Sequence, residues 1–293
     1  MKGPTAPVVV GVDGSSSALA AVEWAAGECA HHKAPLRLVH GYVLPVRGYP
    51  EVVLTGNEVR QAMEVRAREW LGDAEAVART AAPDVEITTH LAASGATALL
   101  IEESRDARLM VLGSQGLGAV TGLLVGSVAL ALASHGKSPL VVLRGTPAPD
   151  GPVVAGVDGS PTSEAALAFA FEAASARDAS LIAVLSWQEY AVDSAYHLSR
   201  LAIDWDRAEE SERRLLAQRL AGWQEKYPDV RVHRVVLRDR PVRALMRYGA
   251  DAQLLVVGSH GRGGFAGMLL GSTSQALLYH SPCPLAIVRP TSG

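Results

Sequence analysis

Glycine and hydroxyl residues at one point of the chain have the spacing of a phosphate-binding loop. Gly113 is followed after two residues by Gly116, and after nine more by Gly126 and Ser127. Glycine lets backbone amides approach an anion closely, and a Gly-Ser pair that opens a helix adds the positive end of the helix dipole. Binding of a phosphate group is therefore the chemistry expected at this loop.

A carboxylate follows the first apolar run of the chain. Residues 8–15 read VVVGVDGS, so Asp13 comes at the end of a segment typical of a buried strand. Because ligands of open parallel sheets bind beyond the carboxyl ends of strands, Asp13 is placed to contact one. Asp is also frequent at the N-cap of a helix, so Asp13 and its counterpart Asp158 have a second interpretation as helix caps. The two roles are compatible.

Both segments recur later in the chain. Residues 153–160 read VVAGVDGS, which places Asp158 145 residues after Asp13. The glycine pattern recurs with identical spacing in Gly258, Gly261, Gly271 and Ser272. Self-similarity at a fixed offset indicates a duplicated domain, and the Pro- and Gly-rich residues 145–152 mark the join. We therefore expect two domains, residues 1–146 and residues 147–293.

Strand-like and helix-like segments alternate within each copy. The first copy has apolar runs at 7–13, 36–42, 85–91, 109–113 and 139–144, with helical patterns ending at 33, over 59–77 and over 96–104. The three- and four-residue steps over 59–77 predict one buried helix face, made by Val59, Met63, Ala67, Trp70, Ala74 and Val77. In the second copy, Ser160 is a candidate N-cap before Pro161, and Leu216 and Leu220 share one face of a long helix. Runs 109–112 and 254–257 show no polar alternation, so helices should cover both faces of a doubly wound parallel sheet.

Composition excludes several classes of protein. The chain has 27 basic and 30 acidic residues and no Lys/Arg stripe, so nucleic acid is an unexpected partner. Its 2 cysteines have no counterpart in the repeat, which argues against a disulfide or a cysteine metal site. No signal peptide or membrane-spanning run is visible, so we expect a cytoplasmic protein that does not bind membranes.

The two motifs together resemble the universal stress protein family, in its ATP-binding branch. The resemblance covers both copies almost end to end and rests on the VGVDGS start and the G-x2-G-x9-G-[ST] loop. It implies two tandem α/β domains of the Rossmann-like, HUP type, each with a five-stranded parallel sheet of order 3-2-1-4-5. It also implies ATP at the junction of strands one and four. Some members of the family carry a divalent cation on the phosphates, so the resemblance allows Mg²⁺ as an optional partner of ATP, and no metal site made by the protein alone is visible in the sequence.

The resemblance further implies a role for each part of the site. Asp13 and Asp158 would lie by the adenosine moiety, the backbone near residues 39–41 and 184–186 would meet adenine, and Ser127 and Ser272 would hydrogen-bond phosphate. The full set expected to bind ATP is Gly11, Val12, Asp13, Gly14, Ser15, Val39, Gly41, Gly113, Ser114, Gly116, Gly118, Gly126, Ser127, Val128, Gly156, Val157, Asp158, Gly159, Ser160, Val184, Ser186, Gly258, Ser259, Gly261, Arg262, Gly263, Gly271, Ser272 and Thr273.

The two glycine loops differ in one charge. Arg262 stands where the first copy has Leu117, and a guanidinium can pair with phosphate whereas an isobutyl group cannot. We therefore predict tighter ATP binding at the second site. His260 lies in the same loop, and the other histidines show no metal spacing and are interpreted as surface or helix-end residues.

Catalytic motifs are missing from the sequence. Residues 136–138 read GKS but lack the earlier glycine of a Walker A loop and precede a strand, and no G-x-S-x-G elbow is present. We expect a regulatory ATP-binding protein of stress response or growth control, with slow ATP hydrolysis at most. A phosphotransfer or ATP-hydrolysing enzyme and a nucleotide-free scaffold are the alternatives.

Two further features concern partner surfaces. The last strand of each copy, Leu140–Leu143 and Leu285–Val288, is short, apolar and at a sheet edge, so we expect the two copies to pair there and the chain to form a homodimer. Residues 43–56 and 188–206 diverge most between the copies and would form adenine-side lids or partner surfaces.

Overall fold

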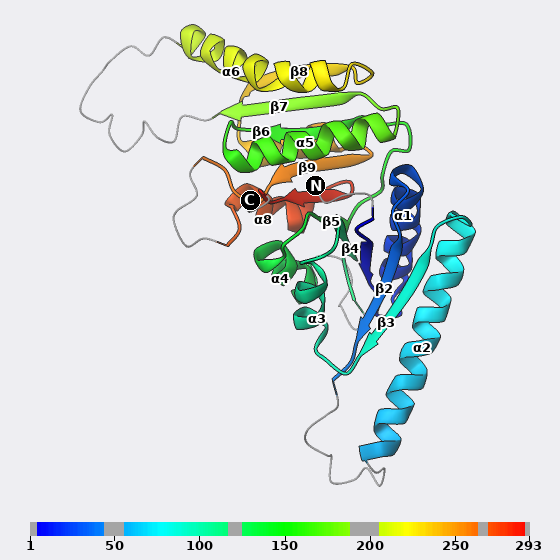
Figure 1. Cartoon of the computed structure of the whole chain (residues 1–293). Helices are drawn as coiled ribbons and strands as arrows, with labels where there is room; N and C mark the ends of the chain where they lie inside the picture. The colour runs from blue at the N-terminus through cyan, green and yellow to red at the C-terminus, as the bar shows by residue number, and fades with distance from the viewer. Residues whose placement is uncertain (1–4, 44–55, 117–124, 188–204, 263–268, 291–293) are drawn as a thin grey trace, which may run out of the picture. The chain divides into compact units, whose positions relative to one another are not determined.

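The computed structural model describes residues 5–43, 56–116, 125–187, 205–262 and 269–290 (Figure 1). The chain divides into two compact units, Met1–Leu143 and Arg144–Gly293. Most of the segments 43–56 and 188–206, to which the sequence assigns lid or partner roles, lie outside the described residues.

Both units contain the same alternation of strands and helices. The elements of the first unit are β1 (Val8–Gly11), α1 (Ser16–His32), β2 (Leu36–Gly41), α2 (Gly56–Ala81), β3 (Ile87–Ala92), α3 (Ala96–Glu103), β4 (Leu109–Gly113), α4 (Ser127–His135) and β5 (Leu140–Leu143). Those of the second are β6 (Val153–Val157), α5 (Pro161–Ala176), β7 (Leu181–Trp187), α6 (Trp205–Lys226), β8 (Val232–Arg238), α7 (Pro241–Gly249), β9 (Leu254–Gly258), α8 (Ser272–His280) and β10 (Leu285–Val288).

The strands of each unit form a parallel sheet with the predicted order. The first sheet runs β3-β2-β1-β4-β5, and the second runs β8-β7-β6-β9-β10. In the first unit α1 packs with α2 on one face of the sheet, and α3 packs with α4 on the other (Figure 1). The doubly wound α/β fold is therefore confirmed. The order in which strands are added to the sheet reverses between β1 and β4, and between β6 and β9. Ligands of such sheets bind at these positions.

Apolar burial on both faces of the central strands explains why the sheet is sandwiched between helices. The side chains of Val9, Val10, Met110 and Val111 are fully buried, with no polar residue alternating among them. α1 adds small side chains at helical spacing, among them Ala21, Ala25 and Cys29, all fully buried. Their small size lets the helix axis lie close to the sheet, which brings the start of α1 next to the strand ends.

The long helix α2 buries a slightly different face from the one its sequence predicts. Ala67 and Ala74 are buried as expected, but Leu71 and Ala78 complete the buried stripe, and Val77 is only half-buried. The strand that follows begins later than predicted, because the amide of Val85 donates to the carbonyl of Ala82 in a turn (3.2 Å). In the second unit Leu216 and Leu220 of α6 are both fully buried, as predicted.

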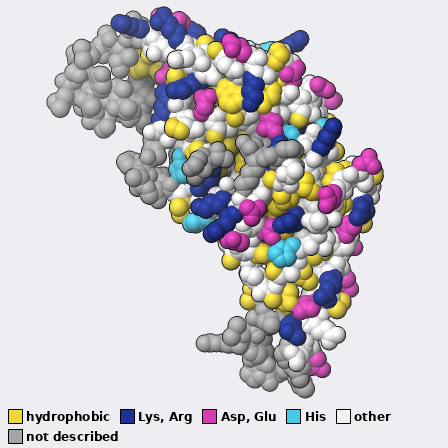
Figure 2. All heavy atoms as spheres, in the orientation of Figure 1, with side chains coloured by type: hydrophobic (Ala, Val, Ile, Leu, Met, Phe, Trp, Pro, Cys, Tyr) yellow, Lys and Arg dark blue, Asp and Glu magenta, His cyan; other side chains and the backbone are white. Residues whose placement is uncertain are grey.

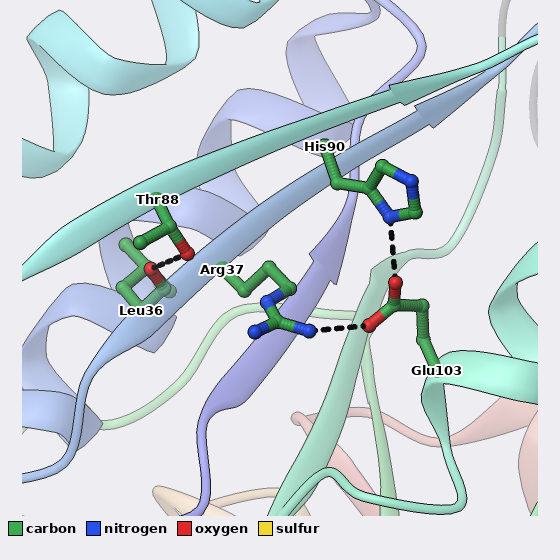
Figure 3. A network of polar contacts seen from close by, with 5 residues as sticks. All are labelled: Leu36, Arg37, Thr88, His90 and Glu103. Atoms are coloured by element: carbon green, nitrogen blue, oxygen red, sulfur yellow. Dashed lines mark hydrogen bonds and ion pairs between the residues drawn. The ribbon is translucent and has the colours of Figure 1, made fainter.

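A polar network ties α3 to the outer strands of the first sheet (Figure 3). The carboxylate of Glu103 accepts a hydrogen bond from Arg37 on β2 (3.1 Å) and lies 2.7 Å from Nδ1 of His90 on β3. The repeat-equivalent positions of the second unit hold Ile182, Val235 and Tyr248. This network is therefore specific to the first unit, where it fixes the helix that borders the candidate site.

The surface carries charges of both signs. On the face shown in Figure 2, basic and acidic side chains are interspersed over the described elements. Among the described residues, no helix combines the length and apolar character needed to cross a membrane.

Candidate functional site

The loop after the first strand of each unit is built around an Asp that supports a helix cap. Oδ1 of Asp13 accepts from the amide (3.0 Å) and the hydroxyl (2.6 Å) of Ser15, and Ser15 Oγ accepts from the amide of Ala18. Ser15 is therefore the N-cap of α1. The interpretation of Asp13 as the cap itself is wrong, because its side chain orients the capping serine instead.

The second unit repeats this arrangement. Oδ1 of Asp158 accepts from the amide of Ser160 (2.9 Å), and Ser160 caps α5 by accepting from the amide of Ser163 (3.2 Å). Ser160 therefore has the cap position that the sequence predicts. The turn before the cap requires glycine, since Gly14 has a φ of +81° and Gly159 a φ of +79°, values that side chains rarely adopt.

The other carboxylate oxygen of each Asp faces the glycine loop. Oδ2 of Asp158 accepts from the backbone amide of Arg262 (2.9 Å). A Cβ atom on Gly261 would lie 2.6 Å from this oxygen, and one on Gly116 would lie 2.6 Å from Oδ2 of Asp13. The second glycine of the pattern is therefore needed for the loop to approach the aspartate, which connects the two loops of the site.

The first glycine of the pattern lies against the start of the first helix. A Cβ on Gly113 would lie 2.6 Å from the carbonyl carbon of Ser17, and one on Gly258 would lie 2.9 Å from that of Thr162. Ser17 Oγ also accepts from the amide of Gln115 (3.4 Å), while the hydroxyl of Thr162 donates to the carbonyl of His260. The first turns of α1 and α5 thus hold the glycine loops in place.

The last glycine of the pattern precedes a helix. Gly126 and Gly271 are the N-caps of α4 and α8, and glycine has no side chain that could accept from the amides of the first turn. The first turn of an α-helix leaves backbone amides without an intrahelical partner, and they carry the positive end of the helix dipole. An anion beside these turns would satisfy them.

These loops enclose one cavity in each unit, at the carboxyl ends of the strands. The cavity of the first unit has a volume of about 360 Å³, and that of the second about 270 Å³. The predicted residues that line the first are Gly11, Val12, Asp13, Val39, Gly41, Gly113, Gly116, Gly126, Ser127 and Val128. Those that line the second are Gly156, Val157, Asp158, Val184, Ser186, Gly258, Gly261, Arg262, Gly271, Ser272 and Thr273.

The remaining predicted residues that the structure describes are not part of the walls of these two cavities. Gly14, Ser15, Gly159 and Ser160 form the turns and caps behind the aspartates, Ser259 is 1% exposed, and Ser114 lies at the end of β4. Gly118 and Gly263 lie outside the described residues. Among the described residues, the cavity walls therefore contain only part of the predicted set.

The structure adds residues that the sequence motifs do not include. Ala96 and Leu100 of α3 line the first cavity, and Pro241 and Leu245 of α7 line the second. These pairs occupy equivalent positions 145 residues apart, so the repeat itself carries the signal that could have identified them. Gln115 and His260, which occupy equivalent places in the glycine loops, also line the cavities.

One histidine was assigned the wrong environment. His40 is only 8% exposed, with Nδ1 2.6 Å from the carbonyl oxygen of Val12, and its ring meets that of Trp70 edge-on at 5.3 Å. The interpretation of His40 as a surface or helix-end residue is wrong, because a backbone carbonyl and an aromatic ring replace water around it. The second unit has Leu185 and Leu215 at the equivalent positions.

The end of the second strand also differs between the sites. Ser186 lines the second cavity and donates through Oγ to the carbonyl of Asp239 (2.5 Å). Its equivalent, Gly41, lies so close to Ser94 that a Cβ atom would be 2.7 Å from the Ser94 carbonyl oxygen. The second site therefore has a hydroxyl group where the first has only backbone.

Comparisons with known proteins identify the family of the chain. A model of the universal stress protein family matches residues 5–144 and again residues 151–289. A universal stress protein of Mycolicibacterium smegmatis is 39% identical over 290 residues, covering 97% of each chain. One of Mycobacterium tuberculosis is 38% identical over 292 residues, covering 96% of each chain.

A solved structure has the same fold over the whole chain. The crystal structure of a universal stress protein from Archaeoglobus fulgidus matches with a TM-score of 0.69 and 17% sequence identity, covering 98% of this chain and 99% of that one. At this identity the match concerns the fold alone.

Proposed function

Because the chain belongs to the universal stress protein family and contains two domains of that family in tandem, we propose that each domain binds one ATP molecule. The observation that carries the proposal is the repeated cavity beyond the carboxyl ends of the strands, lined in both domains by the aspartate, the glycine loop and the first turn of a helix. Cavities of a few hundred Å³ in this position of a doubly wound sheet are typical of sites for small organic ligands.

The phosphate side of the ligand is expected at α4 and α8. Ser127 and Val128 in the first domain, and Ser272 and Thr273 in the second, place the first helical turn in the cavity wall. Backbone amides of this turn, together with the serine hydroxyls, are the donors that phosphate oxygens need. The glycine caps leave room for the anion to approach them.

The opposite wall of each cavity suits a purine base. Val39, Ala96 and Leu100 in the first domain offer apolar surface to the flat ring. In the second domain Val184, Pro241 and Leu245 do the same. A purine base has an apolar face and hydrogen-bonding atoms along its edge. Polar backbone groups at the ends of β2 and β7 would bind that edge.

The environment of Asp158 favours a regulatory role over catalysis. Both carboxylate oxygens of Asp158 accept protein hydrogen bonds, from the amides of Ser160 and Arg262. A carboxylate held in this way serves to shape the loops and is poorly placed to activate a nucleophile. We propose that ATP occupancy is the signal of the protein, in stress response or growth control, and that Mg²⁺ when present is held by the ATP phosphates.

Two substitutions can close the sites one at a time. An Asp at Gly126 or Gly271 is a favourable N-cap residue, and it would place a carboxylate where phosphate is expected. Among the described residues no atom lies within 4 Å of a Cβ built on Gly126. A Cβ on Gly271 would lie 3.2 Å from Cα of His260, so the glycine loop must move by a few tenths of an ångström to accept it. Thermal unfolding without nucleotide checks that both variants fold.

The expected result is that Gly126→Asp and Gly271→Asp each remove one of two ATP sites, measured by equilibrium dialysis, while the double variant binds none. ATP binding that survives in the double variant would contradict the proposal. Adenine nucleotide extracted from the purified wild-type protein would support it independently. Turnover approaching the order of 1 s⁻¹ in a multiple-turnover assay would favour the enzyme alternative.

A further inference from the structure

The guanidinium of Arg262 is already engaged by a carboxylate from the long helix of its domain. Its Nη1 lies 3.6 Å from Oε1 of Glu212 on α6. The backbone amide of Arg262 donates to Asp158, and its Nη2 lies 3.1 Å from the position of a Cβ on Gly159. The arginine thus lies over the loop that follows β6, at the wall of the second cavity.

Glu212 differs from the other glutamates near it. Glu209 and Glu210 of α6 pair with Arg213 and Arg214 one turn away, as expected of a solvated helix face. The side chain of Glu212 is 22% exposed, and its Oε2 is buried with no hydrogen-bond partner in the described part of the chain. Because burying a carboxylate oxygen without a partner costs free energy, the pairing with Arg262 is the main compensation for this charge among the described residues.

The first domain offers no such pair. The positions equivalent to Glu212 and Arg262 are Ala67 and Leu117. Ala67 is 1% exposed and packs in the helix interface. The glutamate and the arginine are therefore both missing at the equivalent positions of the first copy. In the second copy they meet at the boundary between α6 and the glycine loop.

We infer that Glu212 competes with the phosphates of ATP for Arg262, so that it lowers the affinity of the second site and couples occupancy of that site to α6. The inference rests on the proposed function. Glu212 and phosphate are both negatively charged, and Arg262 carries a single positive charge. The arginine can therefore pair fully with only one of these two anions at a time. Glu212 consequently offsets part of the gain in affinity that the arginine alone would give the second site.

The test uses the full-length Gly126→Asp protein, in which only the second site binds, and isothermal titration with ATP and with adenosine. Glu212→Gln is close in shape to the native residue and removes the competing charge. It should tighten ATP binding about five- to tenfold, and adenosine binding should change less than twofold. Glu210→Gln, on the same helix, is the matched control and should change neither.

A second experiment tests whether Glu212 affects ATP binding through Arg262. In an Arg262→Ala background, which itself should weaken ATP binding, Glu212→Gln should have less than a third of its effect in the native background. Unchanged or weaker ATP binding by Glu212→Gln, an equal change for adenosine, or an undiminished effect without Arg262 would each overturn the inference. Thermal unfolding without nucleotide reports on folding of each variant. ATP binding that does not respond to Glu212 overturns this inference alone, whereas absence of ATP binding in the wild-type chain overturns the proposed function as well.

Discussion

At the scale of single residues, the turn glycines are the positions where the site is most tightly constrained. Gly14 has a φ of +81° and lies against the indole ring of Trp70, so that a Cβ atom there would be 2.5 Å from Cδ1 of that ring. An alanine must therefore adopt a strained backbone and displace Trp70, which also contacts His40. The turn, the ring and the buried histidine form one packed unit behind the aspartate.

We expect Gly14→Ala to lower the free energy of unfolding of the first domain by about 2 kcal/mol or more. Gly72 is the matched control, because it lies exposed within α2 and no described atom is within 4 Å of a Cβ built on it. Gly72→Ala should raise the free energy of unfolding by about 0.5–1 kcal/mol through helix propensity. Urea unfolding measures both, and equal effects of the two substitutions would show that the turn is not constrained as described.

The two cysteines should be chemically inert in the folded protein. Burial raises the pKa of Cys29 to about 12, and Glu28 beside it acts in the same direction. Burial raises the pKa of Cys283 to about 11. The thiolate is the reactive form, so at pH 8 only about one thiol in a thousand or fewer is ionised. An aromatic disulfide reagent should label both thiols quickly in guanidinium chloride and at least a hundredfold more slowly in buffer. Fast labelling in buffer would contradict the burial.

Sequence alone could identify the glycines and aspartates of the site because backbone requirements restrict these positions to one or two residue types. Ala96, Leu100, Pro241 and Leu245 could not be identified in this way. Their residue types are those of any apolar helix, and only the packing of α3 and α7 beside the strand ends places them in the cavity wall. Glu212 is a further example, since its sequence context resembles the solvated glutamates around it.

At the scale of elements, apolar periodicity predicts the strands and helices. The structure differs from the prediction where tertiary contacts determine which face of a helix is buried. The buried face of α2 includes Leu71 and Ala78, which are not among the residues that the apolar spacing predicts to be buried. A long helix has several nearly equivalent apolar stripes, and the sheet that it covers selects one of them. Strand order, by contrast, came from the family resemblance, because periodicity does not specify which strands are neighbours.

The network of Figure 3 gives an element-scale prediction. Glu103 is 10% exposed and contacts Arg37 on β2 and His90 on β3, whereas the adjacent Glu102 is 66% exposed and pairs with Arg105 one turn away. We expect Glu103→Gln to lower the free energy of unfolding by about 1–2 kcal/mol, and Glu102→Gln by less than about 0.5 kcal/mol. Denaturant unfolding compares the two. Equal small effects would mean that the network does not anchor α3.

At the scale of the whole molecule, duplication has kept the scaffold of the site and changed its surroundings. The aspartate, the glycine spacing and the helix caps are the same in both domains. The neighbouring residues differ. The first domain has His40 and Trp70 where the second has Leu185 and Leu215, and the second has Glu212 and Arg262 where the first has Ala67 and Leu117. We therefore expect two ATP sites that differ in affinity. Pairing of the domains through β5 and β10, and a homodimer, stay predictions that light scattering can examine.

The central claim is that this universal stress protein binds one ATP in each of its two domains. Isothermal titration of the nucleotide-free wild-type chain with ATP tests it most directly. We predict a stoichiometry of about two ATP molecules per chain, falling to one in either Gly126→Asp or Gly271→Asp. A stoichiometry of zero, or one that neither substitution changes, would contradict the account.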